Sequence, residues 1–220
     1  MELKNNMKTL TECFEIILTG DREASRMAAR EVRRLVYSSQ GDHDKYRDIK
    51  NLINGVPNKY AKIFEEWRQE NFVMAVSVMY FLHDRENQPD FLFPWLFYLL
   101  QHENGNIRHA AVRMLEHELG PLTVHIRFPR HKPDYFGKLT PEKADAILYS
   151  LFINLNELMR ALWQPRYKKY KYISSLPSGP YKSVQMVFGH LQEDCGEEYM
   201  ERLASKLTSL QTGVCKDDVV

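Results

Sequence analysis

The stretch from Pro89 to Leu119 constrains the fold more than any other part of the chain. Residues 91–100 (Phe-Leu-Phe-Pro-Trp-Leu-Phe-Tyr-Leu-Leu) predict an apolar first helix with an internal proline, and Asn-Gly-Asn at 104–106 predicts a turn. Residues 107–119 carry apolar side chains at helical spacing, which predicts an amphipathic second helix. Such a helix pair cannot bury its apolar face alone. We therefore expect a chain of stacked helix pairs.

This unit resembles a HEAT repeat. Its first helix contains Pro94, its turn is polar, and its second helix begins with the pair Ile107 and Arg108, continues through alanines and reaches Leu115. The resemblance implies an all-α fold, namely a right-handed α-α superhelix of HEAT-like or armadillo type with about five helix pairs. It also implies that the second helices line a concave face on which partners bind.

Two further segments share the register of this second helix. In each of the three, apolar or small residues follow a polar residue at offsets of three, seven and eleven. The sets are Ala24, Ala28 and Val32 after Asp21; Met74, Val78 and Leu82 after Asn71; and Ile107, Ala111 and Leu115 after Asn104. Met74 is accordingly expected in the core.

Capping signals and periodicity place the other helices of the first half. A capping box at Thr9 and Glu12 predicts a helix ending at Gly20, and Asp21 caps the next. Residues 38–57 form a polar insertion with a short helix around 46–53. The expected helices that follow are one from Asn58, with Tyr60, Ile63, Phe64 and Trp67 at helical spacing, and one over 71–82.

The second half departs from the repeat pattern. Residues 120–140 are expected to be an irregular loop with an extended segment near 123–128. Thr140 and Pro141 predict the start of a helix that reaches Leu162, because they supply an N-cap followed by proline. Another irregular loop is expected over 164–179. Helices over 180–193 and 197–210 complete a single HEAT-like α-solenoid domain over 1–210, and residues 211–220 are expected to fray.

Composition narrows the functional classes. The net charge of +1 gives no global attraction to nucleic acid or membranes. Three cysteines without paired spacing indicate reduced thiols. The N-terminus lacks a secretory pattern, and the apolar runs are shorter than the ~20 residues of a spanning helix. We expect a cytoplasmic protein with no membrane partner.

Short catalytic signatures are missing from the sequence. It has no HExxH or Glu-x-x-His spacing, no Gly-x-Ser-x-Gly elbow and no P-loop. The sequence therefore predicts no metal site and no cofactor, and it favours a non-enzyme.

An arginine row is the main candidate binding feature. Arg22, Arg26, Arg30 and Arg33 lie within about 80° of one helix face, with Arg34 beside them. The shared register maps Arg26, Arg30 and Arg34 onto His109, Arg113 and His117, and it places Val76, Tyr80 and Asp84 on the helix between. Guanidinium groups suit phosphates or carboxylates because they pair with them bidentately. The alternative is a solvated face with Arg–Glu pairs to Glu23 and Glu31.

A basic, tyrosine-rich loop is the second candidate. Its cations Arg166, Lys168, Lys169 and Lys171 alternate with tyrosines. This alternation is typical of surfaces that stack bases and neutralise phosphates. The tyrosines can equally pack the loop onto the helices while the lysines point outward.

The prediction for function is a non-catalytic scaffold or binding module that holds a protein or an anionic partner on its concave face. A nucleic-acid partner is the alternative, because the general layout of Trp67, Glu70 and Asn71 is similar to that of the DNA alkylation repair glycosylases, which are small HEAT-like proteins. The acids near the central aromatic helices, Asp84 and Asp90, do not lie in that family's catalytic context.

Overall fold

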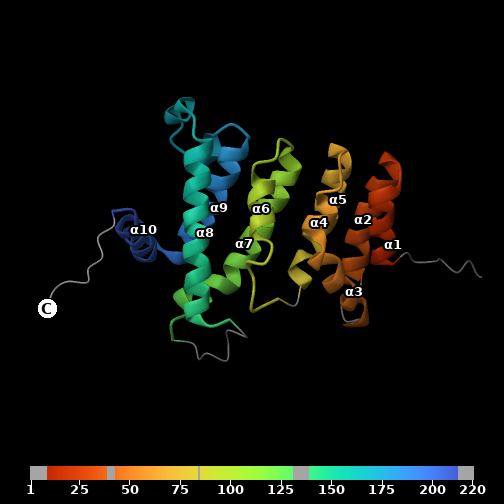
Figure 1. Cartoon of the computed structure of the whole chain (residues 1–220), viewed down its shortest axis with the longest axis horizontal. Helices are drawn as coiled ribbons and strands as arrows, with labels where there is room; N and C mark the ends of the chain where they lie inside the picture. The colour runs from red at the N-terminus through yellow and green to blue at the C-terminus, as the bar shows by residue number, and fades with distance from the viewer. Residues whose placement is uncertain (1–8, 39–42, 84, 131–138, 213–220) are drawn as a thin grey trace, which may run out of the picture. The chain divides into compact units, whose positions relative to one another are not determined.

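The computed structural model describes residues 9–38, 43–83, 85–130 and 139–212, and every element in these ranges is helical (Figure 1). The α-helices are α1 (Leu10–Thr19), α2 (Arg22–Ser38), α3 (His43–Asn54), α4 (Val56–Tyr60), α5 (Glu66–Met79), α6 (Phe93–Leu100), α7 (Gly105–Arg127), α8 (Pro141–Leu162), α9 (Pro180–Cys195) and α10 (Glu197–Thr212). Short 3-10 helices are η1 (Tyr80–Leu82), η3 (Pro165–Lys169) and η4 (Ile173–Ser175). The expected all-α class is confirmed, and the superhelical arrangement stays a prediction.

The chain divides into two compact units. The first comprises Met1–Arg85 and Leu92–Met114, and the second comprises Glu86–Phe91 and Leu115–Val220. The expected single solenoid domain over 1–210 therefore also stays a prediction.

The start of the first unit follows its capping signals. The backbone N–H of Thr9 donates to Glu12 Oε2 at 2.7 Å, and that of Glu12 donates to Thr9 Oγ1 at 3.1 Å, which completes the expected capping box. Gly20 ends α1, and Asp21 Oδ1 accepts the Ala24 N–H at 2.8 Å. The two helices pack against each other, and α2 also packs against α5.

Arg68 of α5 holds the C-terminal end of α1. Its Nη1 donates to the carbonyl oxygens of Ile17 and Gly20, each at 3.0 Å. The side chain is only 12% exposed, and its guanidinium lies 4.5 Å from the Trp67 ring centroid. The last carbonyls of a helix have no partner within the helix itself. Arg68 therefore satisfies, from a distant part of the sequence, groups that α1 cannot satisfy alone.

Aromatic side chains fill the core of the first unit. The fully buried Phe72 meets Phe14 edge-on, with ring centroids 5.6 Å apart, and lies 6.3 Å from Tyr60. Tyr60 in turn packs edge-on against Trp95 at 5.6 Å. These contacts join α1, α4, α5 and α6 around one apolar cluster.

The helix expected from Asn58 through Trp67 is wrong. The chain leaves α4 after Tyr60, Glu65 is extended, and Trp67 lies in the first turn of α5. Phe64, expected on the apolar face, is 89% exposed. The segment between α4 and α5 is stabilised by Gln69, whose Nε2 donates to the Ile63 carbonyl at 2.8 Å.

The helix pair from Pro89 to Leu119 is present with different ends. Helix α6 begins at Phe93, so Pro94 occupies its first turn rather than its interior, where proline fits because the N–H is unpaired anyway. Asn104 Oδ1 accepts the Asn106 N–H at 2.9 Å at the start of α7.

Helix α7 continues to Arg127, so the irregular loop expected from residue 120 and the extended segment near 123–128 are wrong up to that point. Leu119, Leu122 and Thr123 are fully buried and continue the apolar face beyond Pro121. Burial of this face thus outweighs the cost of proline within a helix. The expectations for residues 131–138 lie outside the described residues.

The second unit is built around α8, α9 and α10, which pack against one another. As expected, Thr140 Oγ1 accepts the Lys143 N–H at 3.4 Å, and α8 runs to Leu162. Asp145 of α8 accepts hydrogen bonds from the Tyr199 hydroxyl of α10 and, at 2.9 Å, from the His125 ring of α7. Burial and the bond to Asp145 raise the pKa of Tyr199, so it stays a neutral donor.

The loop after α8 and the last two helices differ little from expectation. The loop expected over 164–179 contains η3 and η4. Gly196, with φ of 77°, separates α9 from α10 in a left-handed conformation that favours glycine. Helix α10 reaches Thr212, while the expected frayed residues 213–220 lie outside the described range. None of the described helices has both the length and the apolar character needed to span a membrane.

Candidate functional site

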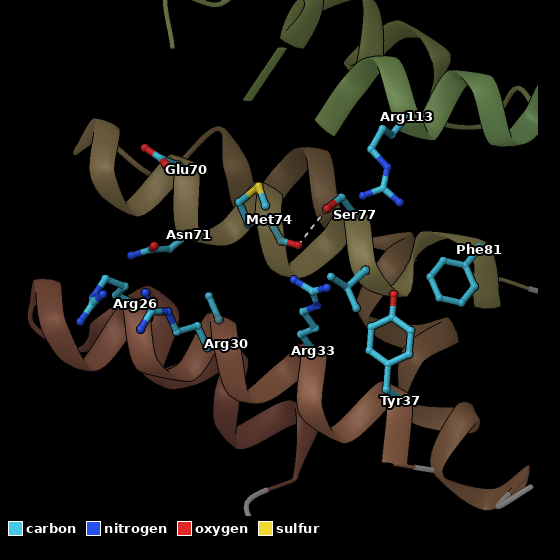
Figure 2. A pocket seen from close by; sticks show the side chains of 12 residues that line it. Arg26, Arg30, Arg33, Tyr37, Glu70, Asn71, Met74, Ser77, Phe81 and Arg113 are labelled. Carbon is cyan, nitrogen blue, oxygen red and sulfur yellow. Dashed lines mark hydrogen bonds between the residues drawn. The ribbon is translucent and has the colours of Figure 1, made fainter. Parts of the chain in front are cut away.

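A groove of about 440 Å³ lies on the first unit between α2 and α5 (Figure 2). Helix α7 contributes one side chain to it. The lining residues are Arg26, Ala29, Arg30, Arg33 and Tyr37 of α2; Glu70, Asn71, Met74, Ser77 and Val78 of α5; Phe81 of η1; and Arg113 of α7.

Helix periodicity explains why these residues meet. The lining positions 26, 30, 33 and 37 on α2, and 70, 74, 77 and 81 on α5 and η1, advance by the same steps of four, three and four residues. Residues at this spacing share one helix face. The opposite faces, with Ala28 and Val32 on α2 and Val73 and Val76 on α5, are buried in the core.

The expected register of the central helix is wrong. Met74, assigned to the core, is 42% exposed and lines the groove, whereas Val76 and Tyr80, assigned to the ridge, are buried. Asp84, the third residue assigned to that ridge, lies outside the described residues. Groove positions on α5 follow those on α2 by 44 residues, not by the 50 that the sequence comparison used.

Two arginines of α2 are paired with acids on the same helix. Arg26 donates from Nε to Glu23 at 2.9 Å, and Arg34 donates from Nε to Glu31 at 2.9 Å. The bond from Arg26 is the main reason why the pKa of Glu23 lies below its usual value. The interpretation of the row as a face of Arg–Glu pairs is therefore correct for these two residues.

Three other arginines carry their charge into the groove. Within the described part of the chain, no carboxylate forms an ion pair with Arg30, Arg33 or Arg113. The guanidinium of Arg33 lies 5.8 Å from the Tyr37 ring centroid, and all three arginines are exposed. In Figure 2, Arg33 from α2 and Arg113 from α7 extend toward the same stretch of α5, near Ser77.

Glu70 is the acidic residue among the described lining residues, and its carboxylate is already engaged. It accepts hydrogen bonds from Asn104 Nδ2 at 2.9 Å and from Asn106 Nδ2 at 2.7 Å. Figure 2 shows the carboxylate turned away from Arg26 and Arg30. Glu70 therefore anchors the start of α7 rather than neutralising the groove.

His102 also connects the segment just before α7 to α5. Its Nδ1 accepts the Asn104 N–H at 2.9 Å, so the other ring nitrogen, Nε2, is the donor to Gln69 Oε1 at 3.2 Å. Partial burial lowers the pKa of His102 and favours this neutral form. The helix that carries Arg113 is thus attached to α5 by neutral hydrogen bonds and by the carboxylate of Glu70.

The structure brings together only part of the predicted site. Arg26, Arg30, Arg33 and Arg113 line the groove, whereas Arg22, His109 and His117 are exposed outside it. The apolar lining residues Tyr37, Met74 and Phe81 were missed, although their spacing on the two helices matches that of the arginines.

The loop cations lie in the second unit and form a separate surface. Arg166, Lys168, Lys169 and Lys171 are exposed on and just after η3. Each lies close to an aromatic ring of the same segment, a pairing that the sequence analysis did not predict.

The described ranges include two free cysteines, Cys13 and Cys195, and both are buried. No group of three or more His, Cys, Asp or Glu side chains there is arranged to hold a metal ion. Burial raises the pKa of the Cys195 thiol to about 12, so this sulfur is protonated at neutral pH and a poor nucleophile.

Comparison with known proteins gives no match. The sequence fits no protein-family model, and it matches no curated protein and no solved structure. The geometry of the arginine groove is therefore the basis for a functional proposal.

Proposed function

We propose that this protein is a non-catalytic binding module whose arginine groove holds an acidic segment of a partner protein. The observation that carries the proposal is the set Arg30, Arg33 and Arg113, which bring three guanidinium groups to one groove without a carboxylate partner among the described residues. Guanidinium groups bind carboxylates through paired, charge-assisted hydrogen bonds.

The apolar lining favours a peptide over a simple anion. Met74 and Phe81 are each 42% exposed and lie beside the arginines, together with the partly buried Val78. A peptide with alternating acidic and apolar side chains supplies both carboxylates for the arginines and apolar groups for this surface. Interfaces commonly gain most of their affinity from such a combination of arginine and buried apolar anchors.

A duplex-DNA partner fits the same groove less well. Its phosphates match the arginines, but the sugar–phosphate backbone leaves Met74 and Phe81 without apolar partners. The groove must also attract DNA by its own arginines, because the net charge of the whole chain is only +1.

Fluorescence anisotropy with the full chain tests the proposal. The probe is a fluorescein-labelled ten-residue peptide of alternating Glu and Leu, and the reference is the matching Lys and Leu peptide. Replacing Arg30 and Arg33 together by Gln should weaken binding of the acidic peptide by at least about tenfold, because each lost charge-assisted bond contributes roughly 1.5 kcal/mol or more.

The control is Arg22→Gln combined with Arg34→Gln, which removes two cations from the same helix outside the groove. It should change affinity less than about threefold, as expected for screened surface charges. Equal losses in the two double variants would contradict the groove as the site. Tighter binding of a twelve-base-pair DNA duplex than of the peptide, at about 150 mM salt, would replace the protein partner with nucleic acid.

A further inference from the structure

A second surface of different chemistry lies in the second unit, on the loop between α8 and α9. Residues 158–192 contain no acidic side chain. A cavity of about 130 Å³ opens here. Its lining residues are Trp163, Tyr167, Lys168, Tyr170, Lys171, Tyr172, Ile173, Leu176, Tyr181 and Gln185.

Internal contacts fix the shape of this loop. The rings of Tyr167 and Tyr181 stack with centroids 4.7 Å apart and planes 17° from parallel. Lys182 Nζ donates to the Leu176 carbonyl at 3.2 Å, and Leu176 itself is buried. One lysine and one pair of rings therefore support the loop.

The remaining lysines and rings face solvent together. Lys168 Nζ lies 5.7 Å from the Trp163 ring centroid, and Lys171 Nζ lies 5.3 Å from that of Tyr172. Trp163 is 41% exposed and Tyr172 is 63% exposed. The surface therefore offers flat aromatic faces with a cation beside each.

Gln185 adds an unused acceptor to the cavity wall. Its Oε1 is buried and accepts no hydrogen bond from the described residues. A buried acceptor without a donor is unfavourable, so a turn of the Gln185 side chain that brings Oε1 to a ligand N–H in the cavity gains more than an ordinary surface hydrogen bond. Planar rings, cations and an acceptor for N–H groups thus converge on one cavity.

We propose that this surface binds single-stranded nucleic acid, with one base in the cavity, its N–H on Gln185 Oε1 and the adjacent phosphates on Lys168 and Lys171. Every base has a flat face for the tyrosines and an N–H on its pairing edge. In a duplex that edge is paired and the base is stacked, so single strands fit and duplexes do not. An acidic peptide lacks the planar group that the cavity accepts. This site is independent of the arginine groove.

The test measures anisotropy of a fluorescein-labelled ten-nucleotide oligodeoxythymidylate bound to the full chain, over a range of salt concentrations. Lys168→Ala with Lys171→Ala should weaken binding and reduce the log–log salt slope by roughly 1.4, because each single-strand phosphate contact contributes about 0.7. The control, Lys62→Ala with Lys143→Ala, removes two exposed lysines elsewhere and should leave affinity within about twofold.

Gln185→Leu separates base recognition from simple charge attraction. It should weaken oligonucleotide binding by about five- to tenfold with an unchanged salt slope, because it removes an acceptor and no charge. Arg30→Gln with Arg33→Gln should leave this binding unchanged. Circular dichroism of each variant should match that of the unaltered chain.

Three results would overturn the proposal. The first is binding of a duplex as tight as that of the single strand. The second is an unchanged affinity in Gln185→Leu, which would reduce the site to an electrostatic surface. The third is tighter binding of an acidic or phosphotyrosine peptide than of the oligonucleotide, which would assign the surface to a protein partner.

Discussion

The arginine groove and the lysine-and-tyrosine loop are both basic, but they present their cations differently. In the groove, helix geometry sets the positions of Arg30 and Arg33, and Arg113 joins them from another helix. In the loop, each lysine lies over the ring of a residue close to it in sequence, as Lys171 does with Tyr172. Positive charge alone therefore does not specify a ligand: forked donors suit carboxylates, whereas cations beside stacking rings suit nucleotides.

The two surfaces also differ in what supports them. Behind the groove, α5 buries Phe72 completely against Phe14 and Tyr60. The loop depends on the Tyr167–Tyr181 stack, whose rings are only partly buried. A substitution in the core of the first unit should therefore disturb the groove. The loss of one ring from the loop should disturb only the loop.

The largest expected effect follows from this difference in support. Phe72→Ala should lower the free energy of unfolding by about 3–5 kcal/mol, because it removes a fully buried ring and leaves a cavity. Tyr167→Ala should cost about 0.5–1.5 kcal/mol, the usual worth of an aromatic pair. Urea denaturation of the two variants measures both values, and similar losses would show that the loop is as deeply supported as the groove.

Exchanging arginine for lysine in the groove, and lysine for arginine in the loop, should have effects of intermediate size on binding. Arg30→Lys with Arg33→Lys keeps the charge but removes the planar fork, so acidic-peptide affinity should fall by about five- to tenfold. Lys168→Arg with Lys171→Arg should leave oligonucleotide affinity within about threefold, because arginine also binds phosphates and stacks on rings. Anisotropy titrations measure both, and the reverse ranking would mean that the two surfaces have been assigned the wrong chemistry.

The smallest expected effect is a pH dependence of stability that arises from His102, in the unit that carries the groove. The pKa of His102 is lowered in the folded chain, so the unfolded chain takes up a proton first as pH falls below about 6.5. The contribution of His102 to stability is therefore complete above that pH and declines from there toward its lowered folded pKa.

His102→Gln should flatten the stability profile measured by urea denaturation between about pH 7 and pH 5, since glutamine does not titrate there. Oligonucleotide binding at the loop should have the same pH dependence in this variant as in the unaltered chain. A stability profile that stays equally steep in the variant would assign the acid sensitivity to other groups.

Local signals in the sequence predicted helix ends well. Thr9 with Glu12, Asp21 and Thr140 all cap helices as expected, because each cap depends only on residues within one turn. The register of α5 could not be obtained this way. Its apolar residues from Phe72 to Met79 are nearly continuous, so periodicity alone does not decide which of them are buried; contacts with Phe14 and Tyr60 do.

The candidate site was predictable where one helix determined it. Arg26, Arg30 and Arg33 share a face because their spacing requires it. His109 and His117 were placed beside Arg113 by steps of four residues, and each such step also moves the side chain about 6 Å along the helix axis. Of these three residues of α7, only Arg113 lies at the level of the groove and lines it. The pairing of Glu70 with Asn104 and Asn106 depends on tertiary contacts that spacing does not encode.

The hydrogen bonds from Arg68 to Ile17 and Gly20 have a consequence for how a shortened or growing chain behaves. These bonds span 51 and 48 residues of sequence, so the C-terminal carbonyls of α1 gain this partner only after α5 has been synthesised and docked. A fragment that ends before residue 65 contains all of α1 and α2 but lacks the arginine. Its first helix should fray at that end and exchange its amide protons faster there than in the full chain. During synthesis, the end of α1 should therefore become fully ordered only after α5 has docked, although Ser25 of α2 already donates to the Ile17 carbonyl.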